Sequence, residues 1–207
     1  MSQLVIKGIR LFDRDSGELY KSKARAEYLE RMFFVCPKCG KVHTLRSEGN
    51  YLYCDSCSLK VEYTEDLRLR SDDPEFKYTS LLEWYEFQKK WIVQQKFEPD
   101  QVIFEDDDVV LHTANPFKER RFISEGKMKL TTEELVIGDA SYKLKDLTIA
   151  SPVSGRKLVF MIGEDSFTAR GPERFNALKY VLMFNKLNTK MKNDHMDLYY
   201  NLEEIDK

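Results

Sequence analysis

The sequence predicts an α+β, β-rich chain: a small four-cysteine module, a spacer helix, and a larger β-domain closed by a C-terminal helix. Three observations predict this order. All four cysteines fall within residues 36–57, apolar residues recur at helical spacing after residues 80 and 172, and most of residues 100–170 alternates with period two. The 207 residues are 42% apolar and 13% aromatic, which suits one domain or two small ones and is richer in aromatics than a disordered chain.

The charge balance and the apolar runs narrow the class of protein. A net charge of −2, from 33 basic and 35 acidic residues, excludes an overall basic field for nucleic acid. No stretch approaches the ~18 uninterrupted apolar residues of a membrane span. Arg10 and Asp13 interrupt the segment where a signal peptide would need an apolar run. We therefore expect a chain that folds in the cytoplasm or lies peripherally at the inner face of the membrane.

Residues 1–31 are expected to form an N-terminal segment that ends in a short helix. Residues 22–31 are rich in good helix formers and lead directly into the cysteine module. A turn signal at Asp15-Ser16-Gly17 separates them from one short apolar run, Leu4-Val5-Ile6.

The four cysteines form two C-x2-C pairs separated by 14 residues: Cys36 and Cys39, then Cys54 and Cys57. A C-x-x-C turn sets two thiolates on the same side of a tight loop, and two such turns can close the tetrahedron that zinc prefers. Four thiolates fill that shell and leave no position for a catalytic water. The pattern therefore predicts a structural Zn²⁺, whose binding contributes folding free energy to a module too small to bury much core.

The flanks of the two pairs predict the hairpins of a rubredoxin-like zinc ribbon over residues 32–70. Gly40 stands after the first pair, where the turn needs a positive φ, and Ser58 takes that position after the second. Residues 48–50 suit a hairpin turn. Strands are expected at 32–35, 44–47, 51–53 and 60–63.

Other uses of the cysteines fit the sequence less well. Two disulfides would suit a secreted chain, and nothing in the sequence marks this one as secreted. A redox C-x-x-C usually stands alone between a strand and a helix, and an iron–sulfur site uses a different spacing. His43 could be a spare ligand, but four sulfurs suffice, so we expect a half-exposed histidine on a strand.

A linker and a spacer helix are expected over residues 71–99. Asp72-Asp73-Pro74 breaks the chain, and Ser80 with Glu83 forms the capping-box pattern of a helix start. Apolar and aromatic residues then recur at helical spacing to about residue 95, and the helix stops near Pro99. We expect its aromatic stripe to be a packing face.

Residues 100–191 are expected to form about seven meandering strands closed by one amphipathic helix, which begins at Pro172. This is the layout of a pleckstrin-homology (PH) or GRAM-like β-barrel, in which the helix plugs an open end of a bent sheet. Residues 192–207 are expected to form a tail. Strands are expected at 102–104, 109–113, 120–130, 134–137, 142–144, 147–149, 158–162 and 166–169.

Three stretches carry a family resemblance: residues 26–39, Thr44-Leu45-Arg46-Ser47-Glu48-Gly49-Asn50, and Glu83-Trp84-Tyr85-Glu86-Phe87-Gln88. Together they resemble the C-terminal extension of certain bacterial lysophosphatidic acid acyltransferases. In those enzymes the catalytic domain is followed by a zinc ribbon, a Trp-containing helix and a PH-like domain. The resemblance spans residues 25–190 and implies a role in phospholipid biosynthesis, with an acyltransferase catalytic domain or a dimer partner as the contact.

The catalytic motif of that family is not matched here. The family uses a His as general base on the acceptor hydroxyl, with an Asp five positions later. At that offset from His43, His112 and His195 stand a Glu, a Phe and a Tyr. The resemblance therefore implies a non-catalytic region, and we assign it no catalytic and no cofactor-binding residue.

The first functional hypothesis is docking at an anionic membrane surface. A PH-like domain could contact lipid headgroups through basic loops, and each basic residue near such a surface contributes about 1 kcal/mol. Glu119 lies inside one of these clusters, and short charged turns are commonly just solvated. The candidates are Lys118, Arg120 and Arg121 on one loop and Arg156 and Lys157 on another.

Two other hypotheses come from different classes. Nucleic-acid binding would use basic and aromatic neighbours in the ribbon, but acidic residues dilute their charge, and we do not expect nucleic acid as a partner. A protein-interaction scaffold would use the helix with Trp84 and Trp91, or the tail around Tyr199-Tyr200. The nucleic-acid candidates are Arg31, Phe33, Phe34, Lys38, Lys41, Arg46, Tyr51, Tyr53 and Lys60.

Overall fold

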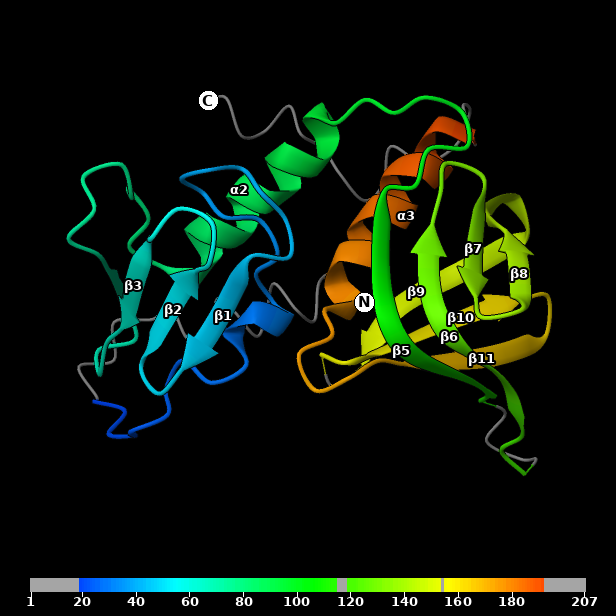
Figure 1. Cartoon of the computed structure of the whole chain (residues 1–207), viewed down its shortest axis with the longest axis horizontal. Coiled ribbons are helices and arrows are strands. Elements are labelled where there is room, and N and C mark those ends of the chain that lie inside the picture. The colour runs from blue at the N-terminus through cyan, green and yellow to red at the C-terminus, as the bar shows by residue number, and fades with distance from the viewer. Residues whose placement is uncertain (1–18, 115–118, 154, 192–207) are drawn as a thin grey trace.

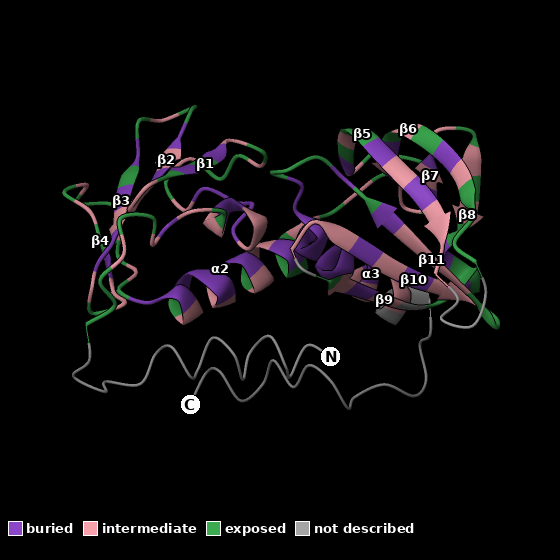
Figure 2. Cartoon of the chain, turned by 90° about the horizontal axis from the view of Figure 1, so that it is seen from below, coloured by how far each residue is buried: buried purple, intermediate pink, exposed green. Residues whose placement is uncertain are grey.

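The computed structural model describes residues 19–114, 119–153 and 155–191. An N-terminal lobe (residues 19–79) and a sheet lobe (residues 100–188) lie side by side, with helix α2 (Leu81–Gln94) along the first and helix α3 (Ala177–Met191) facing it from the second (Figure 1). Both helices bury one flank, and their buried residues belong to one continuous apolar core that runs through both lobes (Figure 2). The α+β, strand-rich class is as predicted.

The N-terminal lobe contains a four-stranded antiparallel sheet in the order β1-β2-β3-β4. Three of these four strands, β1 to β3, were predicted; β4 was not, because two residues carry no periodicity. The turn between β1 and β2 contains Gly49 at φ +59°, as the hairpin signal implied. The elements are the 3-10 helix η1 (Leu29–Arg31), β1 (Leu45–Glu48), β2 (Tyr51–Cys54), β3 (Lys60–Tyr63) and β4 (Leu69–Arg70).

Two predicted elements of this lobe are absent from its described residues. Residues 22–31 form turns and only the three-residue η1 rather than a longer helix. Residues 32–35 form no strand, and their one ladder contact is a bridge from Val35 to Val42. The consecutive side chains of Phe33, Phe34 and Val35 are all buried, so this segment lacks the alternation of a strand with one solvent face.

Helix α2 begins as predicted. The Ser80 side chain accepts a hydrogen bond from the Glu83 amide, and the Glu83 carboxylate accepts one from the Ser80 amide, which completes a capping box. Its aromatic stripe is a packing face: Trp84 is fully buried, stacks on Phe33 at 4.5 Å, and donates its indole N–H to Val35 O at 3.1 Å. The helix therefore belongs to the core of the N-terminal lobe and is not a free spacer.

The sheet lobe is a seven-stranded antiparallel sheet in the order β8-β7-β6-β5-β11-β10-β9. Two meanders, β5 to β8 and β9 to β11, join where β5 pairs with β11, and the sheet curls into a half-barrel (Figure 1). The strands are β5 (Phe104–Thr113), β6 (Phe122–Leu130), β7 (Glu134–Ile137), β8 (Ala140–Lys143), β9 (Leu147–Val153), β10 (Lys157–Ile162) and β11 (Asp165–Arg170), with the 3-10 helix η2 (Leu144–Asp146) before β9.

Differences from the predicted boundaries have local causes. The strands expected at 102–104 and 109–113 are one strand, β5, because a bulge between Asp106 and Val109 lets it continue through three aspartates. Helix α3 begins at Ala177 rather than Pro172. The Phe175 amide first closes a turn on Pro172 O, and the Asn176 side chain accepts from the Lys179 amide at 3.0 Å, which caps the helix.

Helix α3 packs against β9, β10 and η2 and buries the apolar stripe that the sequence predicted. No helix in the described part of the chain is both long enough and apolar enough to cross a bilayer. The expected tail at 192–207 and most of the expected segment 1–31 lie outside the described residues.

Candidate metal centre

The first cysteine turn runs from Cys36 to Cys39 and returns through Gly40. The Cys36 amide donates to Lys41 O at 3.0 Å, and the Gly40 amide donates to Cys36 O at 2.9 Å. Gly40 has φ +69°, the left-handed conformation that the sequence predicted at this position. The amides of Lys38 and Cys39 are directed at Cys36 Sγ. The turn thus presents sulfur to one side and backbone donors around it.

The second turn, Cys54 to Cys57, repeats this geometry at the end of β2. The Cys54 amide donates to Leu59 O at 2.9 Å, and Ser58 takes the left-handed position with φ +56°. The Ser56 amide is directed at Cys54 Sγ and the Leu59 amide at Cys57 Sγ. The two turns are near-equivalent, which the paired spacing in the sequence implied.

The four sulfurs converge on one point between the turns. Cys36 Sγ lies 3.5 Å from Cys57 Sγ, Cys39 Sγ lies 3.8 Å from Cys54 Sγ, and all four lie within 4.8 Å of one another. Zinc–sulfur bonds of about 2.3 Å place the sulfurs of a tetrahedral site about 3.8 Å apart. Disulfide bonds would need about 2.05 Å, and all four cysteines are free. The cluster could hold a metal ion and is compatible with zinc.

Burial and hydrogen bonding act on these thiols in opposite directions. Burial raises the pKa of Cys36 and of Cys57. Burial would also raise the pKa of Cys54, but Thr44 Oγ1 at 3.2 Å and the Ser56 amide outweigh it and lower that pKa to about 7. A bound cation would compensate the thiolate charges that this half-buried pocket otherwise disfavours.

His43 is neither a ligand of the cluster nor a strand residue. It adopts φ +61° between the first cysteine turn and β1, and its ring reaches across to the sheet lobe. Its ring nitrogens lie 3.0 and 3.1 Å from Lys179 Nζ, and Nδ1 lies 3.7 Å from Asp106 Oδ1. Burial, and then the Lys179 cation, lower the pKa of His43, so it is neutral at pH 7.

Lys179 is the buried cation of this junction, with 2% of its side-chain area exposed. Its Nζ lies 2.6 Å from Asp106 Oδ2, which also accepts the Tyr180 hydroxyl at 2.6 Å. Burial lowers the pKa of Lys179 to about 8 despite the aspartate, and burial raises the pKa of Tyr180. The sequence carried a signal for it: Lys179 stands four residues after Phe175, within the apolar stripe of α3.

An ion pair between Glu30 and Arg174 joins the lobes beside the His43–Lys179 contact. Arg174 Nη1 donates to Glu30 Oε1 at 2.7 Å and to Ser47 O at 3.1 Å, and the Asn176 amide donates to Glu30 O at 2.8 Å. A cavity of about 130 Å³ lies between the lobes, and its lining includes Glu30, Arg174, Asn176, His43, Asp106 and Lys179. The charged groups around this cavity already pair with acids or bases of the chain, so we interpret it as part of the contact between the lobes and not as a ligand site. We call this contact the joint between the lobes.

The predicted headgroup residues lie on the sheet lobe. Arg120 and Arg121 are exposed just before β6, and Arg156 and Lys157 lie half-buried at the start of β10. Lys118 falls outside the described residues. Arg120 Nη2 lies 3.1 Å from His112 Nδ1. The loops that carry the two pairs are separate, but they belong to the same curled sheet.

The structure removes some of the other candidate contacts and leaves Lys41, Tyr51, Tyr53 and Lys60 at least partly exposed. Phe33 and Phe34 are buried in the core and cannot stack bases, and Trp84 is buried and cannot meet a partner. Lys38 pairs with Asp73, and Arg46 pairs with Asp55. The segment around Tyr199-Tyr200 lies outside the described residues.

No protein-family model matches this chain, and no curated protein matches it either.

Proposed function

We propose that the four cysteines hold a structural zinc ion in a rubredoxin-like ribbon. Two near-equivalent turns, sulfur spacings close to a tetrahedron edge, and backbone amides directed at the sulfurs support this. Four thiolates fill the coordination shell, so the ion would supply folding free energy and no reaction step. The N-terminal lobe is small, and modules of this size commonly need a metal or disulfides for stability, which makes such a contribution important.

We also propose that the sheet lobe is a PH- or GRAM-like domain. In its support, two antiparallel meanders join through their first and last strands, and a C-terminal helix covers the curled sheet from one side. This architecture commonly serves binding, so the site chemistry has to identify the ligand.

The function that we propose for the chain is a non-catalytic docking region of a phospholipid-biosynthesis acyltransferase. It would hold the catalytic domain, or a second copy, and bring it to an anionic membrane surface. The single observation that carries the proposal is the joint between the lobes. The Glu30–Arg174 ion pair and the contact of His43 with Lys179 join the proposed zinc module to the domain that bears the basic loops. A joined pair of modules suits positioning.

Two measurements test this proposal. Elemental analysis of freshly purified chain should find one zinc per chain. Sedimentation with vesicles should enrich the chain on phosphatidylglycerol-containing vesicles over pure phosphatidylcholine, and less so at high salt. Absence of zinc contradicts the ribbon, and equal distribution between the two vesicle types contradicts membrane docking. The acyltransferase assignment is tested separately, by co-sedimentation with a purified lysophosphatidic acid acyltransferase catalytic domain.

A further inference from the structure

The outer face of strands β10, β11 and β5 carries a pair of cations that face each other directly. Lys157 and Arg170 are cross-strand partners in the β10–β11 ladder. Like charges at directly opposed positions destabilise a sheet. Among the described residues neither side chain has an ion pair. The fold therefore maintains an uncompensated positive pair at this position.

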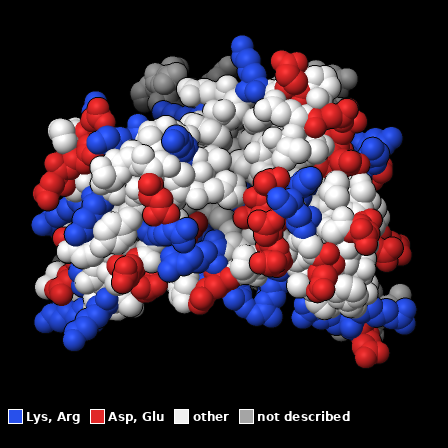
Figure 3. Space-filling model, in the orientation of Figure 1, with Lys and Arg blue, Asp and Glu red and all other residues white. Residues whose placement is uncertain are grey.

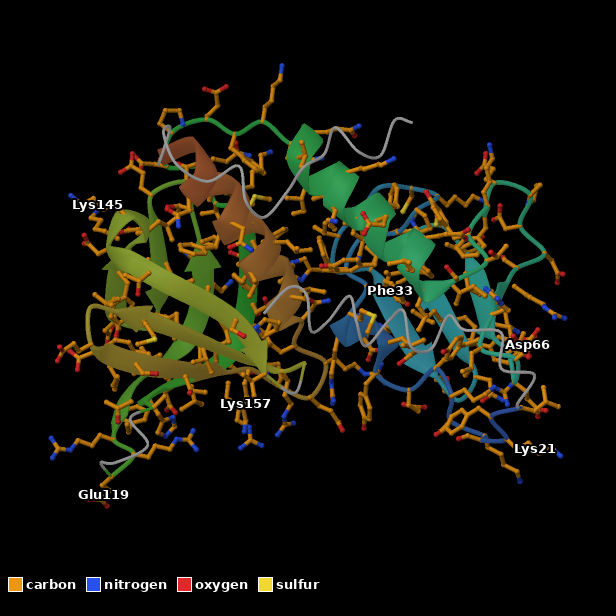
Figure 4. The ribbon with its side chains drawn as sticks, turned by 180° about the vertical axis from the view of Figure 1, so that it is seen from behind. Lys21, Phe33, Asp66, Glu119, Lys145 and Lys157 are labelled. Atoms are coloured by element: carbon orange, nitrogen blue, oxygen red, sulfur yellow. The ribbon has the colours of Figure 1, made fainter. Side chains whose placement is uncertain are left out.

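The alternation of the strands puts this pair on the surface. Their inward neighbours Leu158 and Ala169 are buried in the core, whereas Arg170 is exposed and Lys157 half-buried. Helix α3 packs on the opposite, inner side, and no described element lies over the outer face. Lys157 points outward from the lower rim of the sheet (Figure 4).

Apolar residues accompany the cations on the same face. Phe122, at the start of β6, is 59% exposed and meets the His112 ring edge-on at 5.9 Å. Val153, the cross-strand partner of Lys157 on β9, is 40% exposed. We call the set the outer basic face; it consists of Val110, His112, Arg120, Phe122, Val153, Lys157, Val159, Thr168 and Arg170.

The net charge of this face is positive. Its cations are Arg120, Lys157 and Arg170, and the neighbouring acid is Glu125, which pairs across the ladder with Val110. Glu119 lies at the end of the β5–β6 hairpin. Figure 3 shows Lys and Arg side chains gathered along the lower edge of the sheet lobe, near this hairpin, with one acidic side chain below them. The mixture of cations and an exposed aromatic ring matches an anionic bilayer surface, where headgroup phosphates pair with the cations and the ring enters the interface.

We propose that the outer basic face is the surface that docks to an anionic bilayer, with Lys157 and Arg170 at its centre and Phe122 as the apolar contact. This inference rests on the proposed docking function and specifies its surface. Arg170, Phe122 and Val153 were not among the sequence candidates. Arg121 and Arg156 lie beside the face and contribute only to the long-range field.

The test compares two double variants of equal charge in the full chain. Lys157→Ala with Arg170→Ala removes the central pair, and Lys21→Ala with Lys145→Ala removes two exposed lysines far from it (Figure 4). Since each basic residue at an anionic surface is worth about a fivefold change in partitioning, the first variant should bind phosphatidylglycerol-containing vesicles about 25-fold more weakly. The second should change binding less than about twofold, and Phe122→Ala should weaken it several-fold.

Thermal unfolding of the central double variant is the control for folding, because loss of a stabilising contact would lower the unfolding midpoint. Because the central pair is repulsive, its removal should leave the thermal unfolding midpoint unchanged or raise it while binding falls. Equal losses of binding for the two double variants would mean diffuse electrostatic attraction. Unchanged binding by the central variant would mean that Lys157 and Arg170 do not contact the bilayer. Either result would overturn the outer basic face as the docking surface and leave membrane docking itself intact. The wild-type chain could also bind no vesicles while the acyltransferase catalytic domain protects the outer basic face. That result would make the face a protein contact, and it would contradict both membrane docking and the proposed docking surface.

Discussion

Lys179 Nζ lies 2.6 Å from Asp106 Oδ2, at the point where helix α3, strand β5 and the residue His43 of the N-terminal lobe meet. The lysine is almost fully buried, and the aspartate also receives the Tyr180 hydroxyl. A buried ion pair of this kind adds little net stability compared with apolar residues, but the loss of one partner is costly because the other charge remains buried. The pair lies within the sheet lobe and holds both side chains where His43 of the N-terminal lobe contacts them.

Removal of this lysine should destabilise the whole chain. Lys179→Met leaves Asp106 without its cation and should cost about 3 kcal/mol of unfolding free energy in urea denaturation. Lys145→Met, at an exposed position of η2, should cost less than about 0.5 kcal/mol. A Lys179→Met with Asp106→Leu double variant should recover much of the loss. Failure of the double variant to recover would mean that the charges are not the cause.

The same lysine should make stability depend on alkaline pH. Its folded pKa is about 8, below the ordinary value of 10.5, so between these values the unfolded chain binds more protons than the folded chain. Stability relative to Lys179→Met should therefore rise as pH increases from about 8 toward 10, by at most about 3 kcal/mol. Denaturation midpoints of both proteins across this range measure it. Parallel midpoints would show that the lysine is not desolvated.

Metal removal should unfold the N-terminal lobe first. Chelation leaves four thiols in a half-buried cluster without a compensating cation, and we expect residues 32–64 to lose amide protection in hydrogen exchange. Cys36→Ser should have a similar effect, while the ladder amides of β6, β10 and β11 keep most of theirs. Full protection of β1 to β3 in metal-free protein would contradict a structural ion.

Gln88 should be the most sensitive polar position of helix α2. Its fully buried amide accepts from the backbone N–H groups of Phe34 and Val35 at 2.6 and 3.2 Å and donates to Met32 O at 3.2 Å. Gln88→Leu leaves these groups without partners, and each unsatisfied buried group costs about 1–3 kcal/mol. Gln94→Leu, the same change at an exposed site of the helix, should be nearly neutral. Similar losses for both variants would contradict the bridging role.

Alanine substitutions at two glycines with the same backbone conformation can separate the cost of backbone strain from the cost of steric overlap. Gly138 and Gly163 have φ +55° and +57°, but a methyl group at Gly138 would overlap Glu125 O and the Ser124 hydroxyl, whereas at Gly163 it meets open space. Gly138→Ala should therefore cost about 1–3 kcal/mol more than Gly163→Ala in thermal or urea unfolding. Equal costs would mean that the β7–β8 turn adjusts freely against β6.

Local patterns in the sequence were sufficient where local chemistry decides the structure. The cysteine spacing predicted the sulfur cluster, Gly40 and Ser58 predicted its left-handed turns, and Ser80 with Glu83 predicted the start of α2. Each of these depends on residues within a few positions of one another. The strands β3 and β7 were also predicted to the residue, because alternation there is unbroken.

The remaining features depend on contacts between distant segments. No local pattern reveals that 32–35 gives its backbone hydrogen bonds to Gln88 and Trp84 instead of a strand partner. The opposition of Lys157 and Arg170 follows from register across β10 and β11, which the positions of two short runs do not specify. Likewise, the joint between the lobes pairs Glu30 with Arg174 across most of the chain length.

His43 lies four residues beyond the last sulfur of the first cysteine turn, and it touches the lysine of the opposite lobe. Next to it, Phe34 meets Phe104 edge-on across the same boundary at 6.1 Å. The loop that follows the first cysteine turn therefore contacts the junction between the two lobes. Loss of the proposed zinc ion should therefore weaken the contacts between the lobes and expose these aromatic rings to water, while the strands of the sheet lobe keep their pairing.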